Sequence, residues 1–124
     1  MLKLCMDTAI NFIQNNGTTG YAEQVTGFNG NWSSQEVKDS SGNTIKPAGT
    51  AQRLNTGLTT AQSNIYDMGG NVGEFTTEIN PGTGESVVLR GGNYNNNNPA
   101  GNRWDNNASG ASSYYGFRAT LFLK

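Results

Sequence analysis

Hydrophobic residues follow helical spacing near the start of the chain, in the stretch "TAINFIQNNG". The apolar positions that fall on one side of such a helix are Ala9, Ile10, Phe12 and Ile13. Asp7 precedes them as a residue type that caps helix N-termini, and Gly17 follows as one that readily takes the left-handed conformation at a C-terminus. The pattern therefore predicts one main helix near the N-terminus, between Asp7 and Gly17.

Two stretches near the C-terminus have the hydrophobic pattern of β-strands. "ESVVLRGG" contains a continuous apolar run, and "GFRATLFLK" alternates apolar and polar positions, which predicts a closing strand over residues 117–124. The opening "LKLC" is a candidate antiparallel partner for this last strand, which would make Cys5 a small core residue on a strand. We expect an α+β fold with short antiparallel strands.

Polar segments make up most of the remaining chain. From Tyr21 to Asn64, "FNGNW", "DSSGN" and "KPAG" are turn signals, so we expect mostly loop there. Asparagine dominates "NYNNNNPAGNRWDNN", and its side chain bonds to nearby backbone in turns. We therefore expect an exposed loop in this segment too, and extensive loops in the fold as a whole.

Length and charge restrict the classes of function. The 124 residues suffice for a single domain over residues 1–124. The net charge is -1 and the basic residues are scattered, so no nucleic-acid partner is expected. Asp7 interrupts the apolar start and no small-residue cleavage site follows, so we expect no signal peptide, and no stretch has membrane-spanning length.

The chain has one cysteine, Cys5, and no histidine. A single cysteine excludes an internal disulfide, and the absence of histidine removes the usual general base and the commonest transition-metal ligand. These two absences argue against acid–base or redox-metal catalysis, so we expect no enzyme and no required cofactor.

Three motifs in order, "NIYDMGGNVGEFTTE", "VVLRGGNY" and "GFRAT", closely resemble the spine of the formylglycine-generating-enzyme-like (sulfatase-modifying factor) family, a branch of the C-type-lectin-like fold. The resemblance covers Asn64 to Leu123 and implies that fold. The family usually has an aromatic residue, commonly tryptophan, where this chain has Gly73. Its enzymes activate oxygen with a pair of C-terminal cysteines, and this chain has none after Cys5, so the resemblance implies the fold without the oxidase activity.

The first of these motifs also implies a calcium site. In the family the stretch "N/D-x-x-G-N-x-x-E" wraps a calcium ion. Carried over here, Asp67 and Glu74 would offer carboxylates, and Gly70 and Val72 main-chain carbonyls, which are the hard oxygen ligands that calcium takes. The alternative is that Asn71 and Glu74 only pin a turn by hydrogen bonding to backbone, so a structural calcium ion stays open.

The asparagine-rich segment resembles a segment whose codons have been changed by targeted mutation. In one group of the family, the variable proteins of diversity-generating retroelements, the segment between "RGG" and "GFRA" is changed by an error-prone reverse transcriptase at template adenines. Substitution at the adenines of an asparagine codon, AAC or AAT, reaches Tyr, Asp, Ser, Ala and Gly, which with Asn make up nearly all of this segment. Trp104 is the exception, because TGG contains no adenine. The resemblance implies a scaffold over residues 1–89 and a variable ligand-binding region over residues 90–118.

The composition of this region is close to that of antibody loops, with tyrosine and tryptophan among small polar residues. The candidate ligand-binding residues are Tyr94, Asn95, Asn96, Asn97, Asn102, Trp104, Asp105, Asn106, Asn107, Ser113, Tyr114 and Tyr115. Trp104 and Tyr94 are the first of these that we would reassign to the core. The residues expected to be scaffold are Gly91, Gly92, Phe117 and Leu121.

We therefore expect a non-enzymatic binding protein on a phage virion or bacterial surface, with a protein or glycan on a target cell as its partner. One alternative is a calcium-dependent sugar-binding lectin, suggested by Asp105, Asn106 and Asn107 beside Trp104, although the Glu-Pro-Asn or Gln-Pro-Asp triplet of such lectins is absent. The other alternative is a formylglycine-generating oxidase, which the missing cysteines disfavour.

Overall fold

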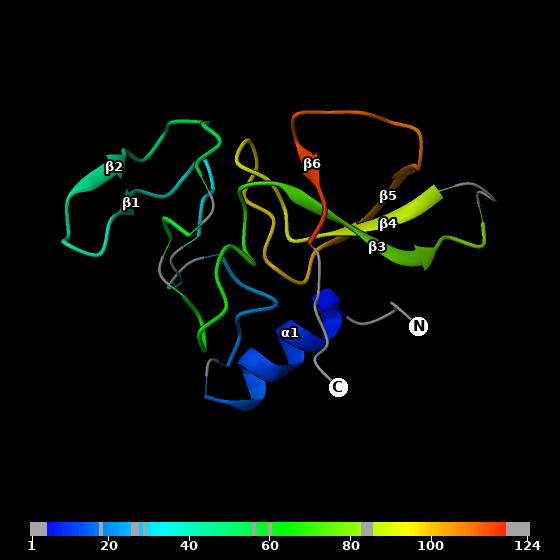
Figure 1. Cartoon of the computed structure of the whole chain (residues 1–124), viewed down its shortest axis with the longest axis horizontal. Helices are drawn as coiled ribbons and strands as arrows, with labels where there is room; N and C mark the ends of the chain where they lie inside the picture. Colours follow the sequence, from blue (N-terminus) through cyan, green and yellow to red (C-terminus); the bar gives the residue numbers. More distant parts are fainter. Residues whose placement is uncertain are drawn as a thin grey trace.

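The described part of the chain contains one helix and six short strands, in the order α1, β1 to β6 (Figure 1). The computed structural model describes residues 5–17, 19–25, 28, 30–55, 57–59, 61–82 and 86–118. The elements are α1 (Cys5–Asn15), β1 (Val37–Lys38), β2 (Thr44–Lys46), β3 (Gly73–Ile79), β4 (Ser86–Arg90), β5 (Arg103–Asn107) and β6 (Tyr115–Gly116). This arrangement confirms the predicted α+β class.

Two separate sheets divide the strands. β1 and β2 form a small antiparallel hairpin, which lies far from the helix in Figure 1. The other four strands form one sheet in the order β5-β4-β3-β6. Its β5–β4 and β4–β3 pairs are antiparallel, whereas β6 pairs with β3 in parallel. The chain enters β6 by a long loop over the sheet, so the asparagine-rich segment contributes both edges of it.

The predicted helix is present but starts earlier than expected. α1 begins at Cys5, so Asp7 lies in its first turn and the placement of Cys5 on a strand is wrong. An acidic residue in a first turn still favours a helix electrostatically. The helix ends as predicted, because Gly17 takes a left-handed φ of 100°. No helix among the described residues is long and apolar enough to cross a membrane.

The buried side of α1 is narrower than its apolar pattern suggests. Ile10 and Ile13 are buried, whereas Phe12 is 49% exposed. Successive helix positions are separated by 100°, so residue 12 falls to the side of the stripe formed by residues 10 and 13. The stripe packs in a core cluster whose other buried members are Tyr21, Met68 and Ala100.

The long segment before β3 is mostly loop, as predicted, and a buried tryptophan organises it. Trp32 is fully buried, and its ring lies where a side chain at Gly30 or Gly69 would be, with built Cβ atoms 2.3 and 2.6 Å from ring carbons. Its indole Nε1 donates a 2.6 Å hydrogen bond to the carbonyl of Asn98, in the asparagine-rich segment. The scaffold therefore holds that segment by its backbone. The β1–β2 hairpin was not predicted.

The strand predictions near the C-terminus have mixed outcomes. β4 forms where "ESVVLRGG" predicted a strand, and Val88 and Leu89 are fully buried. The predicted closing strand starts at residue 117, whereas the residues that pair in the sheet are Tyr115 and Gly116 of β6. Phe117 follows β6 and is 83% exposed, so the prediction that Phe117 belongs to the buried scaffold is wrong. With only two paired residues, β6 ends before Phe117 could be packed in the sheet. Residues 119–124, with Leu121, and residues 2–4 lie outside the described residues.

Two strands of the main sheet lie where the sequence predicted other structure. β3 occupies the end of the predicted calcium motif, and β5 occupies "RWDNN", which was expected to be loop. All five residues of β5 pair in register with β4. Ladder hydrogen bonds with an apolar central strand have overridden the turn preference of asparagine.

Candidate functional site

The main sheet has two chemically different faces. Successive side chains of a strand point to opposite sides, so Trp104 and Asn106 lie on one face of β5 and Asp105 on the other, with Asn107. The Nδ2 atom of Asn106 donates a 2.6 Å hydrogen bond to the hydroxyl of Tyr115 on β6. The predicted ligand-binding residues of β5 are therefore divided between the faces. Asn106 therefore does not share a face with Asp105 and Asn107, and the lectin alternative stays a hypothesis.

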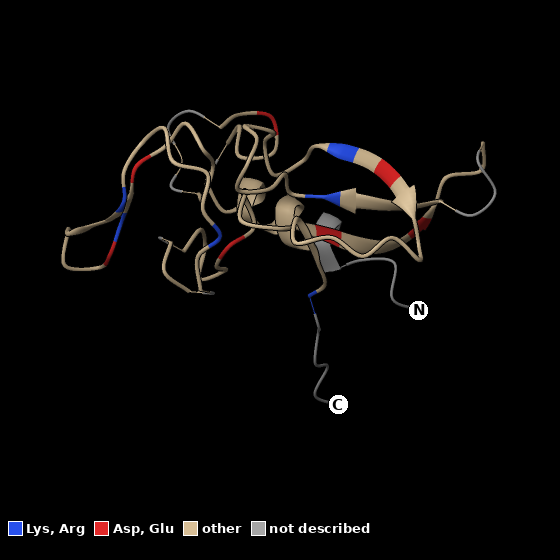
Figure 2. Ribbon diagram, turned by 90° about the horizontal axis from the view of Figure 1, so that it is seen from above, with Lys and Arg blue, Asp and Glu red and all other residues tan. Residues whose placement is uncertain are grey.

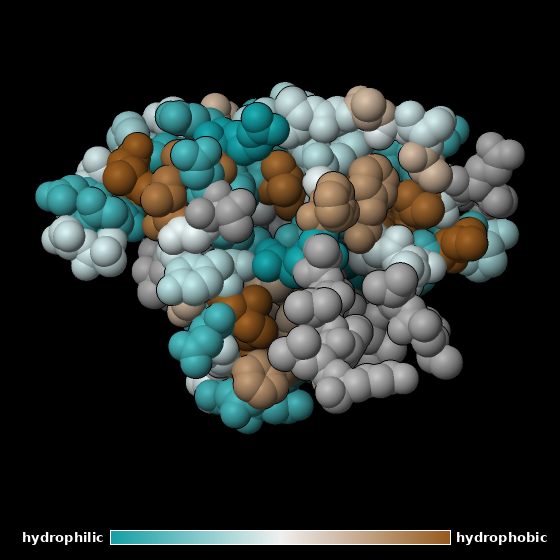
Figure 3. All heavy atoms as spheres, viewed as in Figure 1, coloured by the Kyte–Doolittle hydropathy of each residue, from teal (hydrophilic) through white to brown (hydrophobic). Residues whose placement is uncertain are grey.

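We call the side that carries Phe75, Trp104, Asn106 and Tyr115 the aromatic face. All four side chains are half-buried, and the rings of Phe75 and Tyr115 meet edge to face with centroids 5.8 Å apart. In the space-filling view, apolar side chains lie across the strands of the main sheet (Figure 3). Half-exposed rings with an amide among them make this face a surface suited to contact with another molecule.

The indole of Trp104 is packed against Gly73 on this face. A Cβ atom built at Gly73 would lie 2.5 and 2.7 Å from the Cζ2 and Cη2 atoms of the Trp104 indole. The indole therefore fills the space of the missing side chain, at the position where the family resemblance implies an aromatic residue. Trp104 is half-buried, so it is neither a core residue nor a freely exposed one.

A second aromatic pair joins the aromatic face at the start of β3. The rings of Tyr94 and Tyr114 lie 5.2 Å apart, and the Tyr94 hydroxyl is 3.3 Å from the hydroxyl of Ser113. The carbonyl of Tyr114 accepts a 2.8 Å hydrogen bond from the amide of Gly73, which holds the pair beside Trp104. Tyr114 is 37% exposed. The structure thus brings together five predicted residues, namely Tyr94, Trp104, Asn106, Tyr114 and Tyr115.

Two asparagines of the segment from Asn93 to Asn98 support its backbone. The Oδ1 atoms of Asn93 and Asn96 accept hydrogen bonds from the amides of Asn95 and Asn93, at 2.9 and 3.1 Å. Asn97 reaches outside the segment, because its Oδ1 accepts from Ser33 Oγ at 3.2 Å and from the amide of Ser34 at 3.1 Å. The side chain of Asn95 is exposed. Asn96 and Asn97 are therefore supports, and Asn95 is a candidate contact residue.

Asn102 stays apart from the aromatic face. It is half-buried, and its amide donates a 2.9 Å hydrogen bond to the carbonyl of Pro99 in the turn before β5. Gly91 and Gly92 behave as the predicted scaffold, with left-handed φ values of 96° and 69°. A Cβ atom at Gly92 would also lie 2.4 Å from the carbonyl oxygen of Asn98, so only glycine fits there.

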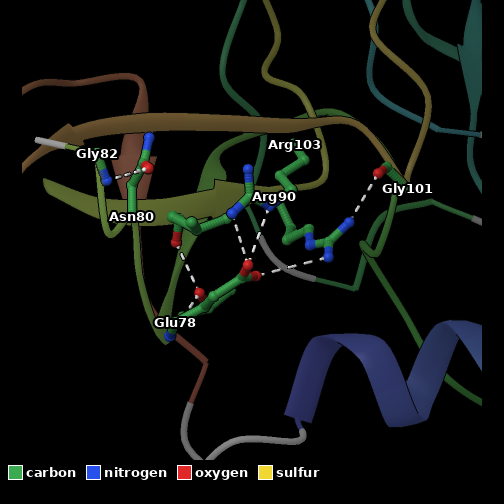
Figure 4. Close-up of polar contacts among 8 residues, drawn as sticks. Glu78, Asn80, Gly82, Arg90, Gly101 and Arg103 are labelled. Carbon is green, nitrogen blue, oxygen red and sulfur yellow. Dashed lines mark hydrogen bonds and ion pairs between the residues drawn. The ribbon is translucent and has the colours of Figure 1, made fainter.

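The opposite face of the main sheet carries ion pairs and lies toward α1. Arg103 donates to Glu78 from Nε at 3.1 Å and from Nη2 at 2.6 Å, while Arg90 Nη2 lies 3.7 Å from the other carboxylate oxygen (Figure 4). Arg90 also donates to the carbonyl of Gly101 at 3.0 Å. In Figure 2, residues of both charge signs are spread along the described part of the chain. The charged side chains of β5 therefore serve this face.

The carboxylates of the predicted calcium site have protein partners. Arg118 holds Glu74 with Nε at 3.0 Å from both carboxylate oxygens and Nη2 at 2.7 Å from one of them. The two oxygens of Asp67 accept from the amide of Gly57 at 2.5 Å and from Thr59 Oγ1 at 2.7 Å. A calcium ion would have to displace a guanidinium from Glu74, so these residues as arranged do not fit the ion. Calcium binding itself is untested, and from this arrangement we expect none.

The neighbouring buried groups support the alternative role of this motif. Glu74 is 7% exposed, and burial raises the pKa of its carboxyl, while Arg118 opposes that effect. Asn71 has a left-handed φ of 59°, and its Oδ1 accepts from Asn31 Nδ2 at 2.9 Å and from the amide of Leu54 at 3.0 Å. The motif therefore fixes the entry to β3 through side-chain hydrogen bonds and one ion pair.

Sequence reasoning missed one residue of the aromatic face and the anchors beneath it. Phe75 went unnoticed because β3 was not predicted as a strand. Ser33 bonds to the side chain of Asn97 and Trp32 to the backbone carbonyl of Asn98, at sequence separations of 64 and 66. No local pattern signals contacts of that range.

Comparison with known proteins gives one family. A family model described as "Sulfatase-modifying factor enzyme 1-like domain" matches residues 11–121. A search of curated protein sequences found no match. The matched range contains every residue of the aromatic face, the Tyr94–Tyr114 pair and the Glu74–Arg118 ion pair.

Proposed function

We propose that the chain, which belongs to the sulfatase-modifying factor enzyme 1-like domain family, is a non-enzymatic ligand-binding protein with a C-type-lectin-like fold. Its binding surface is the aromatic face together with the Tyr94–Tyr114 pair. The observation that carries the proposal is the convergence of five half-exposed or exposed residues of the asparagine-rich segment on one side of the sheet.

The chemistry of this surface suits recognition. Tyrosine and tryptophan give large amphipathic contact areas and lose little conformational entropy when they are ordered, and asparagine and serine offer both donors and acceptors. Rings near the centre of an interface commonly supply much of its binding free energy. The partner in this proposal is a protein or glycan on a target cell surface, met by a chain displayed on a virion or a bacterium.

The architecture also suits exchange of the contact residues. The backbone of the segment is held by Trp32 and by its own Asn93 and Asn96, none of which needs the side chain of Asn95 or Tyr114. Exposed side chains on a backbone fixed from below can vary at small cost in stability. This separation is what a surface rewritten at adenines requires.

Sequencing the DNA around the coding region tests the diversification. We expect a reverse transcriptase gene and a nearby copy of the codons for residues 90–117 that differs from them only where the copy has adenine. A flanking locus with neither element would refute the assignment to diversity-generating retroelements. The proposal that the surface binds a ligand would then have to be tested by binding measurements alone.

A display library tests the surface directly. Randomising the codons of Tyr94, Asn95, Asn106, Ser113 and Tyr114 should yield folded variants that bind new protein or glycan targets. A matched control library changes the exposed residues 51–53 and 55 in the scaffold. Binders from the control library at equal frequency, or none from the first library, would contradict the proposal.

Because the family is named for an enzyme, formylglycine-generating oxidase activity has to be tested as well. The sequence has no cysteine after Cys5, so the proposal expects no oxygen-dependent conversion of a cysteine-containing sulfatase-type peptide. Incubation of the protein with such a peptide under oxygen, followed by mass spectrometry, is the assay. A product that disappears on mutation of one residue of this chain would overturn the non-enzymatic assignment.

A further inference from the structure

A hollow of about 600 Å³ lies between the β1–β2 hairpin and the loop that leads to β3. This volume falls within the range of roughly 300–1,000 Å³ typical of small-molecule sites. The lining residues are Lys38, Asp39, Ser40, Leu58, Thr59 and Tyr66, with Gly57 and Ala61 between them. None of these residues belongs to the aromatic face, and all precede the asparagine-rich segment in the chain.

Two large apolar side chains of the hollow are exposed. Tyr66 is 47% exposed and Leu58 is 38% exposed. Both line the same hollow, and both come from the loop that leads to β3. In Figure 3 apolar side chains also stand among polar ones on the hairpin side of the molecule. An aromatic ring and an aliphatic side chain at a concave site offer an apolar contact surface to a small molecule.

The wall that carries these side chains is held in place by Asp67. One carboxylate oxygen accepts from the amide of Gly57 at 2.5 Å, and the other accepts from the Thr59 hydroxyl at 2.7 Å. Tyr66 directly precedes Asp67, so the same hydrogen bonds link Tyr66 and Leu58 through neighbouring backbone. A site with a preformed wall spends little binding free energy on ordering itself.

The turn of the hairpin also lines the hollow, and its conformation is fixed by hydrogen bonds. Asp39 Oδ1 accepts from the amides of Ser41 and Asn43, each at 2.9 Å, and Oδ2 accepts from Asn43 Nδ2 at 3.1 Å. The amide of Gly42 donates to the carbonyl of Asp39 at 3.0 Å. The turn therefore keeps one fixed shape beside the hollow.

The polar groups at the rim carry both signs of charge. Lys38 Nζ lies 3.1 Å from Glu36, and both side chains are about half exposed, at 53% and 43%. Among the lining residues, Lys38 supplies one ammonium and Asp39 one carboxylate, whose opposite charges favour neither an anion nor a cation. The rim can both donate hydrogen bonds, from Lys38 and Ser40, and accept them at carboxylate oxygens.

We propose that this hollow is a metal-independent binding site for a neutral sugar ring. A pyranose has a C–H face that can stack on an aromatic ring, because the negative π face attracts polarised C–H groups. Its hydroxyls are donors and acceptors, which matches a rim that offers both. The site lies on the scaffold and does not rest on the proposed function of the aromatic face.

Amide NMR spectra of the ¹⁵N-labelled protein test the site, with a chelator present throughout. The probes are methyl α-glucopyranoside, methyl α-mannopyranoside, methyl β-galactopyranoside and N-acetylglucosamine. We expect at least one of them to shift the amides of residues 38–40 and 57–59. Tyr66→Ala should weaken this binding by about tenfold, and Tyr66→Phe should retain it because the ring remains.

The controls separate this site from the aromatic face. Tyr114→Ala removes an exposed tyrosine from that face and should leave the sugar-induced shifts unchanged. Leu58→Ala is a second variant of the hollow, to be used if Tyr66→Ala fails to fold, and it should also weaken the shifts. Absence of shifts at these amides with every probe, or shifts that persist equally in Tyr66→Ala or Leu58→Ala, would overturn the proposal and leave the aromatic face untouched.

Discussion

The contact between Gly73 and Trp104 yields a prediction in which the sign of the effect is decisive. The φ of Gly73 lies outside the left-handed region. Replacing such a glycine by alanine normally stabilises a protein by about 0.4–1 kcal/mol, because the unfolded chain loses freedom. Here the new Cβ would lie 2.5 Å from Trp104 Cζ2, against about 3.5–4.0 Å for a normal carbon contact. The indole must therefore move by about 1 Å or leave its seat.

Overpacking of this kind costs about 1–3 kcal/mol. The reduced freedom of the unfolded chain offsets part of this cost, so Gly73→Ala should destabilise the protein by about 0.5–2 kcal/mol. Urea unfolding measures this value. Tryptophan emission should also shift to the red, because Trp32 is fully buried and the displaced Trp104 would become more exposed. Gly82→Ala is the matched control, since its nearest neighbour would be 3.5 Å away.

A double-mutant cycle isolates the cause. In a Trp104→Ala background the clash no longer exists, so Gly73→Ala should become neutral or stabilising there. If Gly73→Ala stabilises the parent as Gly82→Ala does, with no change in emission, then the indole does not occupy this seat and the reasoning fails.

Three further predictions concern the ion pair, the calcium site and the variable segment. Arg118→Gln should cost about 3 kcal/mol at neutral pH, since it leaves buried Glu74 unpaired. Burial raises the pKa of Glu74, so protonation of its carboxyl favours the folded state. The stability lost in Arg118→Gln should therefore become smaller as the pH falls through that pKa. A loss of stability that grows in acid would contradict this expectation. Melting temperature should be the same with millimolar calcium and with a chelator, whereas a calcium-dependent rise that Asp67→Asn abolishes would establish the calcium site. Joint replacement of Asn95, Asp105 and Tyr114 should change the free energy of unfolding by no more than about 0.5 kcal/mol each, against about 2–5 kcal/mol for Leu89→Ala; equal losses in thermal melts would mean that these residues are structural.

The sequence predicted the elements whose signals are local. Ile10 and Ile13 gave helical spacing, residues 87–89 gave an apolar run, and Gly17, Gly91 and Gly92 marked left-handed positions. β5 could not be predicted in this way, because its asparagines favour turns and its partner strand lies across a loop. The pairing with β4 decides its conformation, and pairing is a tertiary property.

The candidate site was predicted as a set of residue types and without its geometry. Tyr94 and Tyr114 were both candidates, but their contact depends on the path of the chain from β5 to β6. Once β5 is known to be a strand, alternation alone separates Asn106 from Asp105. Phe117 was assigned to the core from an alternating pattern, although the paired part of that segment ends at Gly116.

The packing of Trp104 against Gly73 has a consequence for which codons of the segment must be preserved. The family resemblance implies an aromatic ring on β3, and here the indole of Trp104 on β5 fills that space, so the scaffold depends on a packing residue from the segment proposed to be rewritten. Tryptophan has a single codon, TGG, and it contains no adenine. A mutator that acts only at adenines would pass over this codon in every generation while it changes its neighbours. The genetic code would then protect the side chain on which each new variant depends to keep its shape.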